Sequence, residues 1–148
     1  MRRFFLTTFF LLTTSLIFAQ LDIVSESDKI EEVGTIRLSY SKLIAQGSTY
    51  YLMIRTSNQF DDGTLFCLGK TAESSIMTAQ DMITLINRIE VDAPFDVCDS
   101  MGEKAIFIKK KMIGKPYLVI KMNNCAGNSN ITPKELEKVI KMINKRSN

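Results

Sequence analysis

The sequence predicts an α+β protein in which an antiparallel sheet of about five strands carries two helices on one face. Three observations support this class. Short segments alternate apolar and polar side chains, as half-buried strands do. Turn sequences that contain glycine join these segments in pairs, which favours hairpins. Two further segments each follow a threonine and carry apolar side chains at helical spacing.

The first three strands of the expected sheet lie before residue 70. Residues 36–41 alternate apolar and polar side chains, and the β-rich segment 49–56 follows the turn sequence Gln46-Gly47-Ser48. This arrangement predicts a hairpin. A second turn sequence, Asp61-Asp62-Gly63, precedes a short apolar segment over 64–68, which we expect to be the third strand.

The first helix is expected to begin at Thr78, whose hydroxyl group can form a capping box with Asp81. Pro94 stops any continuation of this helix, because the residue before a proline avoids helical backbone. Residues 92–103 are then expected to form a loop. One face of the helix is apolar and consists of Met82, Ile83, Ile86 and Ile89.

A second hairpin follows. Residues 104–112 and 116–122 have strand character and are joined by the turn sequence Ile113-Gly114-Lys115. The polar residues 123–130 predict a loop after this hairpin.

The last helix carries the clearest signals. Thr132 is expected to cap it, Pro133 occupies its first position, and Glu135 completes a capping box. Its apolar face consists of Leu136, Val139, Ile140 and Ile143.

A short pattern occurs twice along the chain. The strands Tyr51-Leu52-Met53-Ile54-Arg55 and Tyr117-Leu118-Val119-Ile120-Lys121 share the order Tyr-Leu-x-Ile-basic, and each precedes a helix capped by threonine. One hypothesis is a duplicated ββα unit with an extra strand in the first copy. The alternative is a chance likeness between amphipathic elements of the same composition.

The N-terminal segment has the order of a secretory signal peptide. Arg2 and Arg3 precede an apolar run over residues 4–18, and the small residue Ala19 offers a cleavage site. We expect residues 1–19 to be removed and residues 20–148 to form one domain, with 20–32 as a loosely ordered lead-in and no membrane span. The alternative is an uncleaved anchor, but the run is shorter than the ~20 apolar residues of a bilayer span and contains hydroxyl side chains. The expected location is the periplasm, the cell envelope or the extracellular space.

The absence of histidine limits the chemistry that this chain can perform. It excludes Ser-His-Asp and Cys-His hydrolases and zinc sites with histidine ligands. The spacing of the cysteines and of the carboxylates matches no metal motif, and no cofactor motif is present. We therefore expect no metal and no cofactor.

Charge is distributed unevenly along the chain. Residues 20–103 contain 14 acidic and 6 basic residues, whereas residues 104–148 contain 2 acidic and 11 basic residues. This asymmetry suggests an anionic partner for the C-terminal third. The alternative is internal, because the two parts can attract each other within one fold.

Several residues are candidates for binding a partner. On the last helix, lysines at helical spacing form one stripe, for which a solvated outer face is the alternative. Adjacent tyrosines on one strand face opposite sides of the sheet, so one is expected in the core and the other on a contact surface. The lysines at 109–111 are expected to protect a sheet edge. The candidate binding residues are Lys134, Lys138, Lys141, Lys145, Arg146, Tyr50 and Tyr51.

The three cysteines suggest one disulfide bond. Cys98 and Cys125 flank the open end of the second hairpin and are expected to pair. Cys67 lies within an apolar strand, and we expect it to be a buried hydrophobic residue.

Two functions follow from these observations as hypotheses. The first is a small exported, non-catalytic binding module that engages a protein or an anionic envelope component through an exposed sheet face or the basic C-terminal helix. The second is a glycan-processing enzyme that uses two carboxylates. A nucleic-acid partner is disfavoured by the export signal and by the lack of interleaved basic and aromatic residues. The carboxylates for the enzyme would come from Asp61, Asp62, Asp92, Asp96, Asp99 and Glu103.

Overall fold

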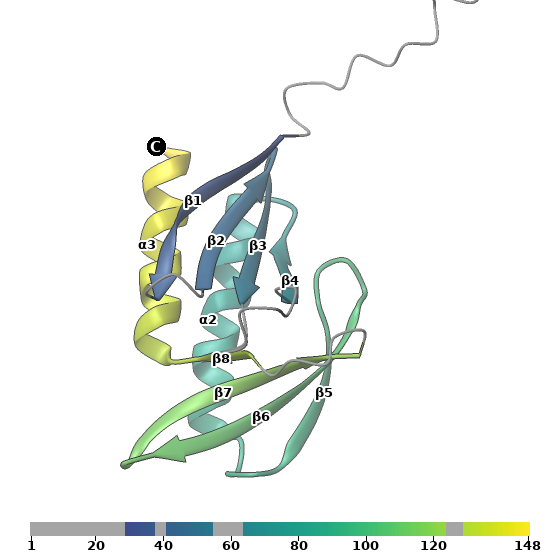
Figure 1. The fold of residues 1–148 in the computed structure, drawn as a ribbon, viewed down its shortest axis with the longest axis vertical. Helices are drawn as coiled ribbons and strands as arrows, with labels where there is room; N and C mark the ends of the chain where they lie inside the picture. Colours follow the sequence, from purple (N-terminus) through teal and green to yellow (C-terminus); the bar gives the residue numbers. More distant parts are fainter. Residues whose placement is uncertain (1–28, 38–40, 55–63, 124–128) are drawn as a thin grey trace, which may run out of the picture.

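The computed structural model describes residues 29–37, 41–54, 64–123 and 129–148. In these ranges the chain forms two four-stranded antiparallel sheets and two helices (Figure 1). The α+β class predicted from the sequence is confirmed.

The first sheet has the strand order β1-β2-β3-β4. Its central hairpin turns at Gly47 and Ser48, and Gly47 has a φ of 58°. Glycine suits this first turn position because it has no Cβ to clash there. The edge strand β1 has two irregularities in its register with β2. The four strands are β1 (Ile30–Arg37), β2 (Ser41–Gln46), β3 (Thr49–Ile54) and β4 (Thr64–Gly69).

The second sheet has the order β5-β6-β7-β8. Its β6–β7 hairpin extends to the pair Met112 and Lys115, and Ile113 and Gly114 form a two-residue turn. The predicted second hairpin is therefore confirmed. The four strands are β5 (Pro94–Cys98), β6 (Lys104–Met112), β7 (Lys115–Met122) and β8 (Ser129–Ile131).

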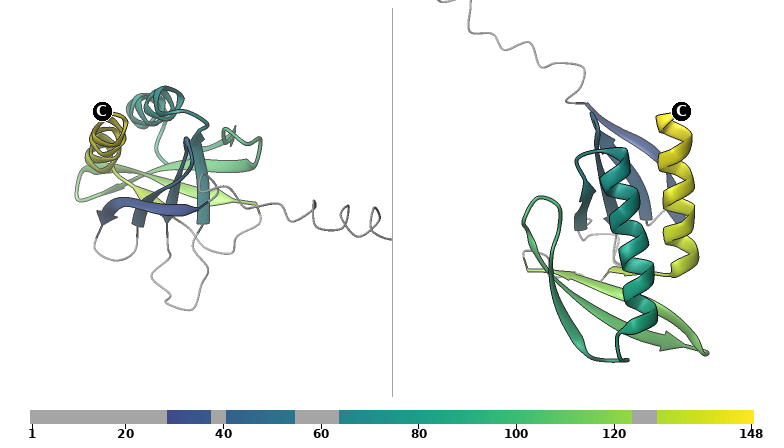
Figure 2. Two further views of the ribbon diagram at one scale, coloured as in Figure 1. Left: turned by 90° about the horizontal axis from the view of Figure 1, so that it is seen from above. Right: turned by 180° about the vertical axis from the view of Figure 1, so that it is seen from behind.

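Both helices cover the same face of the first sheet (Figure 2). α2 (Ala72–Arg88) packs against β4, and α3 (Pro133–Ser147) lies along β1. Each helix also contacts the other. The apolar faces of the two helices are thereby buried against the sheet and against each other.

One hydrophobic core contains side chains from both sheets and both helices. The rings of Phe66 on β4 and Phe107 on β6 lie 5.5 Å apart between centroids and connect the two sheets. Leu52, Ile86 and Leu136 are among the fully buried side chains of this core. The two sheets therefore share one apolar interior rather than two separate ones.

The number of sheets differs from the prediction of one sheet of about five strands. Residues 92–103 and 123–130 were expected to be loops, yet they contain β5 and β8. β5 begins with a proline and is mainly exposed, and β8 has 3 residues. Neither segment has an alternating pattern long enough to indicate a strand. Their pairing with β6 and β7 decides their conformation.

The first helix begins about two turns earlier than predicted. Thr71, not Thr78, is its N-cap, and Ser74 completes the capping box in place of Asp81. The Thr78 hydroxyl instead donates to the Ser74 carbonyl within the helix at 3.0 Å. The apolar face is less distinct in the first turns, which explains the late predicted start. For α3, the predicted cap Thr132, Pro133 and Glu135 are all confirmed.

The order of elements is the same in both parts of the chain. Four antiparallel strands in sequential order precede a threonine-capped helix, first as β1–β4 with α2 and then as β5–β8 with α3. The strands that carry the repeated Tyr-Leu-x-Ile pattern, β3 and β7, are each the third of their set. The unit whose order repeats is thus ββββα rather than the predicted ββα. Residues 30–32 belong to β1 instead of a lead-in, and the predicted signal peptide, residues 1–19, lies outside the described residues.

Candidate functional site

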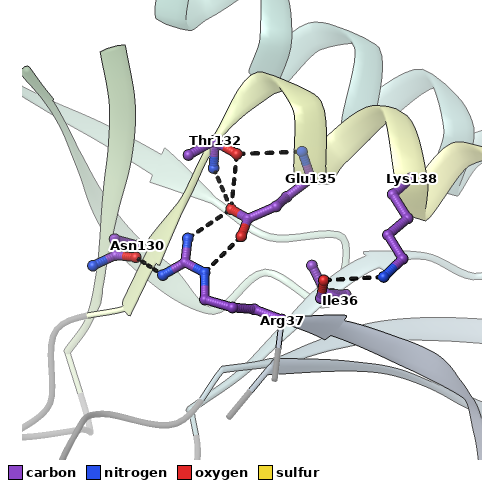
Figure 3. Close-up of polar contacts among 6 residues, drawn as sticks. All are labelled: Ile36, Arg37, Asn130, Thr132, Glu135 and Lys138. Atoms are coloured by element: carbon purple, nitrogen blue, oxygen red, sulfur yellow. Dashed lines mark hydrogen bonds and ion pairs between the residues drawn. The ribbon is translucent and has the colours of Figure 1, made fainter. Parts of the chain in front are cut away.

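The end of β1 and the start of α3 are joined by Arg37 and Glu135 (Figure 3). The Arg37 Nε and Nη2 groups donate to the two carboxylate oxygens of Glu135 at 2.6 and 2.7 Å. The Nη1 group donates to Asn130 Oδ1 at 2.6 Å. A planar guanidinium matches a carboxylate in this two-bond geometry. The contact holds β1, β8 and α3 together at one end of the molecule.

Glu135 also completes the cap of α3. Its Oε2 atom accepts hydrogen bonds from the Thr132 backbone N–H at 2.8 Å and from the Thr132 hydroxyl at 2.9 Å. Burial by itself raises the pKa of the Glu135 carboxyl. The hydrogen bonds from Arg37 and Thr132 together outweigh burial, so that this pKa lies below its ordinary value. Glu135 is therefore an ionised structural residue.

Arg146, one of the predicted binding residues, is used within the fold. Its guanidinium donates to the Gly47 carbonyl at 3.3 Å and to the Tyr50 hydroxyl at 3.1 Å. It also pairs with Glu31 at 3.0 Å, and its central carbon lies 5.3 Å from the centre of the Tyr50 ring. These contacts attach the end of α3 to the first sheet. Arg146 does not extend a free basic stripe.

The lysines of α3 divide into two groups. The Lys138 ammonium donates to the Ile36 carbonyl at 3.2 Å, where β1 has an irregular register (Figure 3). Lys134, Lys141 and Lys145 are exposed and form no ion pair among the residues that the structure describes. The available basic stripe therefore consists of these three lysines.

The two tyrosines face opposite sides of β3, as predicted. Tyr50 is only 2% exposed and lies in the core, with its hydroxyl bonded to Arg146. Tyr51 is half-buried on the face of the first sheet away from the helices, opposite Ile44 and Cys67. Only Tyr51 of this pair can contribute to a contact surface.

The β6–β7 hairpin carries a second basic group. Lys109 donates to the Ile89 carbonyl at 3.0 Å, and Lys110 pairs with Asp92. After Lys109, β6 pairs only with β7 among the described strands. The predicted position at a sheet edge is therefore correct only for the last residues of β6. Lys111 and Lys115 are exposed at this end.

The tip of the hairpin is apolar and exposed. Met112 is 67% exposed and Ile113 is 96% exposed. Ile113 and Gly114 have φ values of 51° and 76°, which define a type I′ turn. A β-branched residue rarely adopts a positive φ. The sequence predicts a turn here but not its exposed apolar tip, although an isoleucine before glycine in a two-residue turn is itself unusual.

A hollow of about 410 Å³ lies between this tip and the start of α3. Met112, Ile113, Pro116 and Tyr117 contribute to its apolar wall, and Arg37 lies at its other side. Because Arg37 already bonds to Glu135 and Asn130, it has little capacity to bind a ligand anion there. The hollow is therefore mainly an apolar surface beside the hairpin tip.

The described carboxylates have structural or solvent-facing positions. Asp99 is 8% exposed and accepts hydrogen bonds from the backbone N–H groups of Cys67, Met101 and Glu103 at 3.0, 2.8 and 2.9 Å. It joins the β5–β6 loop to the free edge of β4. Asp92 pairs with Lys110, whereas Asp96 and Glu103 are exposed.

These positions give no support to a two-carboxylate centre. Asp96 is the one carboxylate among the described residues that line a second hollow of about 400 Å³ beside Cys98 and Lys104. Asp61 and Asp62 lie outside the described residues. Across the described ranges, no three His, Cys, Asp or Glu side chains are arranged to hold a metal ion.

The described cysteines differ in environment. Cys67 is buried, and burial, followed by the nearby Asp99 carboxylate, raises the pKa of its thiol. It is therefore a buried hydrophobic residue, as predicted, and a poor nucleophile. Cys98 is exposed at the end of β5 as a free thiol, and Cys125 lies outside the described residues.

Within the described ranges, no helix has the length and hydropathy needed to span a membrane. Comparison of the chain with family models, with curated proteins and with solved structures finds no match.

Proposed function

We propose that this protein is a small exported, non-catalytic binding module that engages an acidic macromolecular partner through its basic side. The basic side consists of the exposed lysines of α3 and of the β6–β7 hairpin. The observation that carries the proposal is a group of five exposed lysines, on α3 and at the tip end of the β6–β7 hairpin, that form no ion pair with other described residues: Lys111, Lys115, Lys134, Lys141 and Lys145.

The arrangement of the elements supports one continuous surface. The tip of the β6–β7 hairpin and α3 lie on the same side of the molecule in all three views (Figures 1 and 2). Of the two acidic residues of α3, Glu135 is neutralised by Arg37, and the exposed Glu137 offsets one of the lysine charges on this side. A partner would therefore meet an excess of positive charge.

Attraction between the two parts of the chain accounts for only some of this charge. Arg146 pairs with Glu31, and Lys110 pairs with Asp92, so each basic residue is balanced by an acid from the earlier part of the chain. The lysines of the basic side remain after these pairs are subtracted. Attraction within the fold therefore does not account for these unpaired lysines.

The outer face of the second sheet is an alternative contact surface within the same proposal. Ile108, Val119 and Tyr117 are half-buried on the face of β6 and β7 that points away from the core. Lys110 lies opposite Tyr117 on this face. An apolar strip beside lysines suits a protein partner that adds contacts to a sheet face.

The test is capture of native partners by residues 20–148, either with the native sequence or with the exposed lysines of α3 replaced. A variant with Lys134→Glu, Lys141→Glu and Lys145→Glu should lose a stoichiometric partner at low salt. A matched control with Lys70→Glu, Arg88→Glu, Gln80→Glu and Asn87→Glu changes the net charge by the same amount at exposed positions on or next to α2 and should retain the partner. Retention by both variants would exclude α3 and favour the sheet face. Glycan turnover by the purified protein, in the absence of any partner, would instead favour the carboxylate enzyme.

Export is part of the same proposal. Residues 1–19 have the charge and hydropathy order of a signal peptide, and an oxidising compartment favours a Cys98–Cys125 disulfide. Cys98 pairs with Lys104, whose carbonyl accepts from the Asn123 N–H, so Cys98 lies two strands from Asn123, the last described residue before Cys125. Mass spectrometry of the protein from its native cells tests both points. A mature N-terminus at Gln20 and a linked Cys98–Cys125 peptide are expected, and an intact Met1 would contradict export by this route.

A further inference from the structure

We propose that the tip of the β6–β7 hairpin docks the protein on an anionic lipid bilayer. Met112 and Ile113 enter the interface between headgroups and acyl chains, and Lys111 and Lys115 contact lipid phosphates. The inference rests on the proposed function, since it names the acidic partner as a membrane surface.

The backbone of the tip is the first observation. Ile113 occupies the first central position of a type I′ turn at a φ of 51°. Asparagine, aspartate or glycine fits this position, whereas the branched Cβ of isoleucine clashes with the backbone. An observed backbone outlier of this kind indicates a function other than folding.

The exposure of the tip is the second observation. With exposed fractions of 96% for Ile113 and 67% for Met112, these side chains contribute little to the core. Their neighbours Pro116 and Tyr117 continue the apolar surface along the adjacent hollow. Two large apolar side chains at a protruding turn gain free energy only if another apolar phase takes them from water.

The third observation is the positive charge around the tip, which favours an anionic lipid surface as the partner. Residues 104–122 contain six lysines and no acidic residue. Met112 pairs with Lys115 and Lys111 pairs with Pro116, so the two lysines lie on opposite faces of the hairpin. Their ammonium groups can reach phosphates on both sides while the tip enters the interface. The start of α3, where the exposed Lys134 follows Thr132, borders the same hollow as the tip and adds a further cation near it.

A lipid surface fits this geometry better than a folded protein does. A protein partner would need a matching pocket for a convex tip, whereas an interface of headgroups and acyl chains accepts any small apolar wedge. One apolar wedge alone binds weakly, and basic residues beside it supply the second signal that stable attachment needs.

The first experiment uses Ile113→Asn. An Asn-Gly pair is preferred in a type I′ turn, so this variant should unfold at a higher temperature than the native protein. Binding to sedimented vesicles of phosphatidylcholine with about 30% phosphatidylglycerol should nevertheless weaken about tenfold or more. The control Met101→Asn removes an exposed apolar side chain from the β5–β6 loop and should bind as the native protein does. Equal vesicle binding by Ile113→Asn and the native protein would overturn the proposal.

The second experiment reports depth. The chain contains no tryptophan, so Met112→Trp introduces a single emitting indole. Its emission should shift to shorter wavelength with the anionic vesicles and be quenched by lipids brominated on their acyl chains, whereas Met101→Trp should show neither change. Absence of both changes in Met112→Trp would overturn insertion of the tip.

The outcomes separate this inference from the function on which it rests. If Ile113→Asn and the native protein capture the same soluble acidic partner and neither binds vesicles, the binding module stands and the lipid proposal fails. The lipid proposal would also fail if the native protein bound vesicles of pure phosphatidylcholine as well as anionic vesicles, even if Ile113→Asn lost this binding. The lysines would then have no role.

Discussion

The carboxylate of Glu135 accepts two hydrogen bonds from the guanidinium of Arg37, although 98 residues separate the two along the chain. The same carboxylate caps α3 through Thr132. One side chain therefore fixes both the start of the last helix and its attachment to the edge strand of the first sheet. The side chain of Glu135 is 17% exposed, so the contact is only partly screened by water.

The first prediction concerns the size of this contribution. Glu135→Gln keeps the shape of the side chain but removes its charge, and should lower the free energy of unfolding by about 1–2 kcal/mol after allowance for the exposure of Arg37. Urea denaturation measures the change. The control Glu137→Gln, an exposed position on the same helix, should change stability by less than about 0.5 kcal/mol. Equal effects of the two substitutions would contradict a specific role for Glu135.

The second prediction concerns pH. The pKa of Glu135 is lower in the folded protein than its ordinary value of 4.5, so the folded state binds fewer protons than the unfolded state near that pH. The stabilisation from Glu135 is therefore complete above the unfolded pKa and is lost as the pH falls through the folded pKa. The native protein should lose more stability on acidification than Glu135→Gln does. Parallel curves of unfolding temperature against pH would contradict this.

The third prediction concerns Asp99. Its carboxylate accepts three backbone N–H groups at a site that is 8% exposed. Asp99→Ala leaves these donors without their acceptor and should cost about 2–4 kcal/mol. Amide hydrogen exchange should show faster exchange at Cys67 and Glu103. Asp96→Ala, at an exposed position on β5, is the control and should leave both amides protected.

The fourth prediction concerns the approach of α2 to β4. A Cβ on Gly69 would lie 2.6 Å from the backbone nitrogen of Ser75. Because backbone cannot move aside without displacing the helix, Gly69→Ala should destabilise the protein by about 1–3 kcal/mol. Gly34→Ala is a matched control, since its Cβ would meet the flexible end of Met142. Thermal unfolding of both variants checks the prediction, and a Gly69→Ala protein as stable as Gly34→Ala would contradict it.

Local patterns predicted the elements that carry their own signals. The hairpin over 104–122 has two segments rich in strand-forming residues around a glycine turn, and α3 has a threonine cap followed by proline and glutamate. β5 and β8 lack such signals. They are strands because β6 and β7 offer hydrogen bonds to them, and those partners are set by the tertiary fold.

In the candidate site, too, some features follow from the local sequence and others depend on tertiary contacts. Helical spacing correctly placed the lysines of α3 away from its buried face, but spacing alone does not reveal that Lys138 and Arg146 reach β1 and Tyr50. Those contacts join residues 102 and 96 positions apart. The exposed Ile113 was visible in the sequence as part of a turn, yet its positive φ and its protrusion depend on the pairing of Met112 with Lys115.

The sequence by itself determined the α+β class, the second hairpin, the cap of α3, the burial of Cys67 and the excess of basic residues after position 104. These properties arise from neighbouring residues, because strand alternation, capping and turn conformation act over a few positions. The tertiary structure alone decided that there are two sheets and which lysines are already bonded. It also decided that Asp99 and Glu135 hold separate elements together. Such outcomes depend on which distant segments exclude water from one another, and no local pattern contains that information.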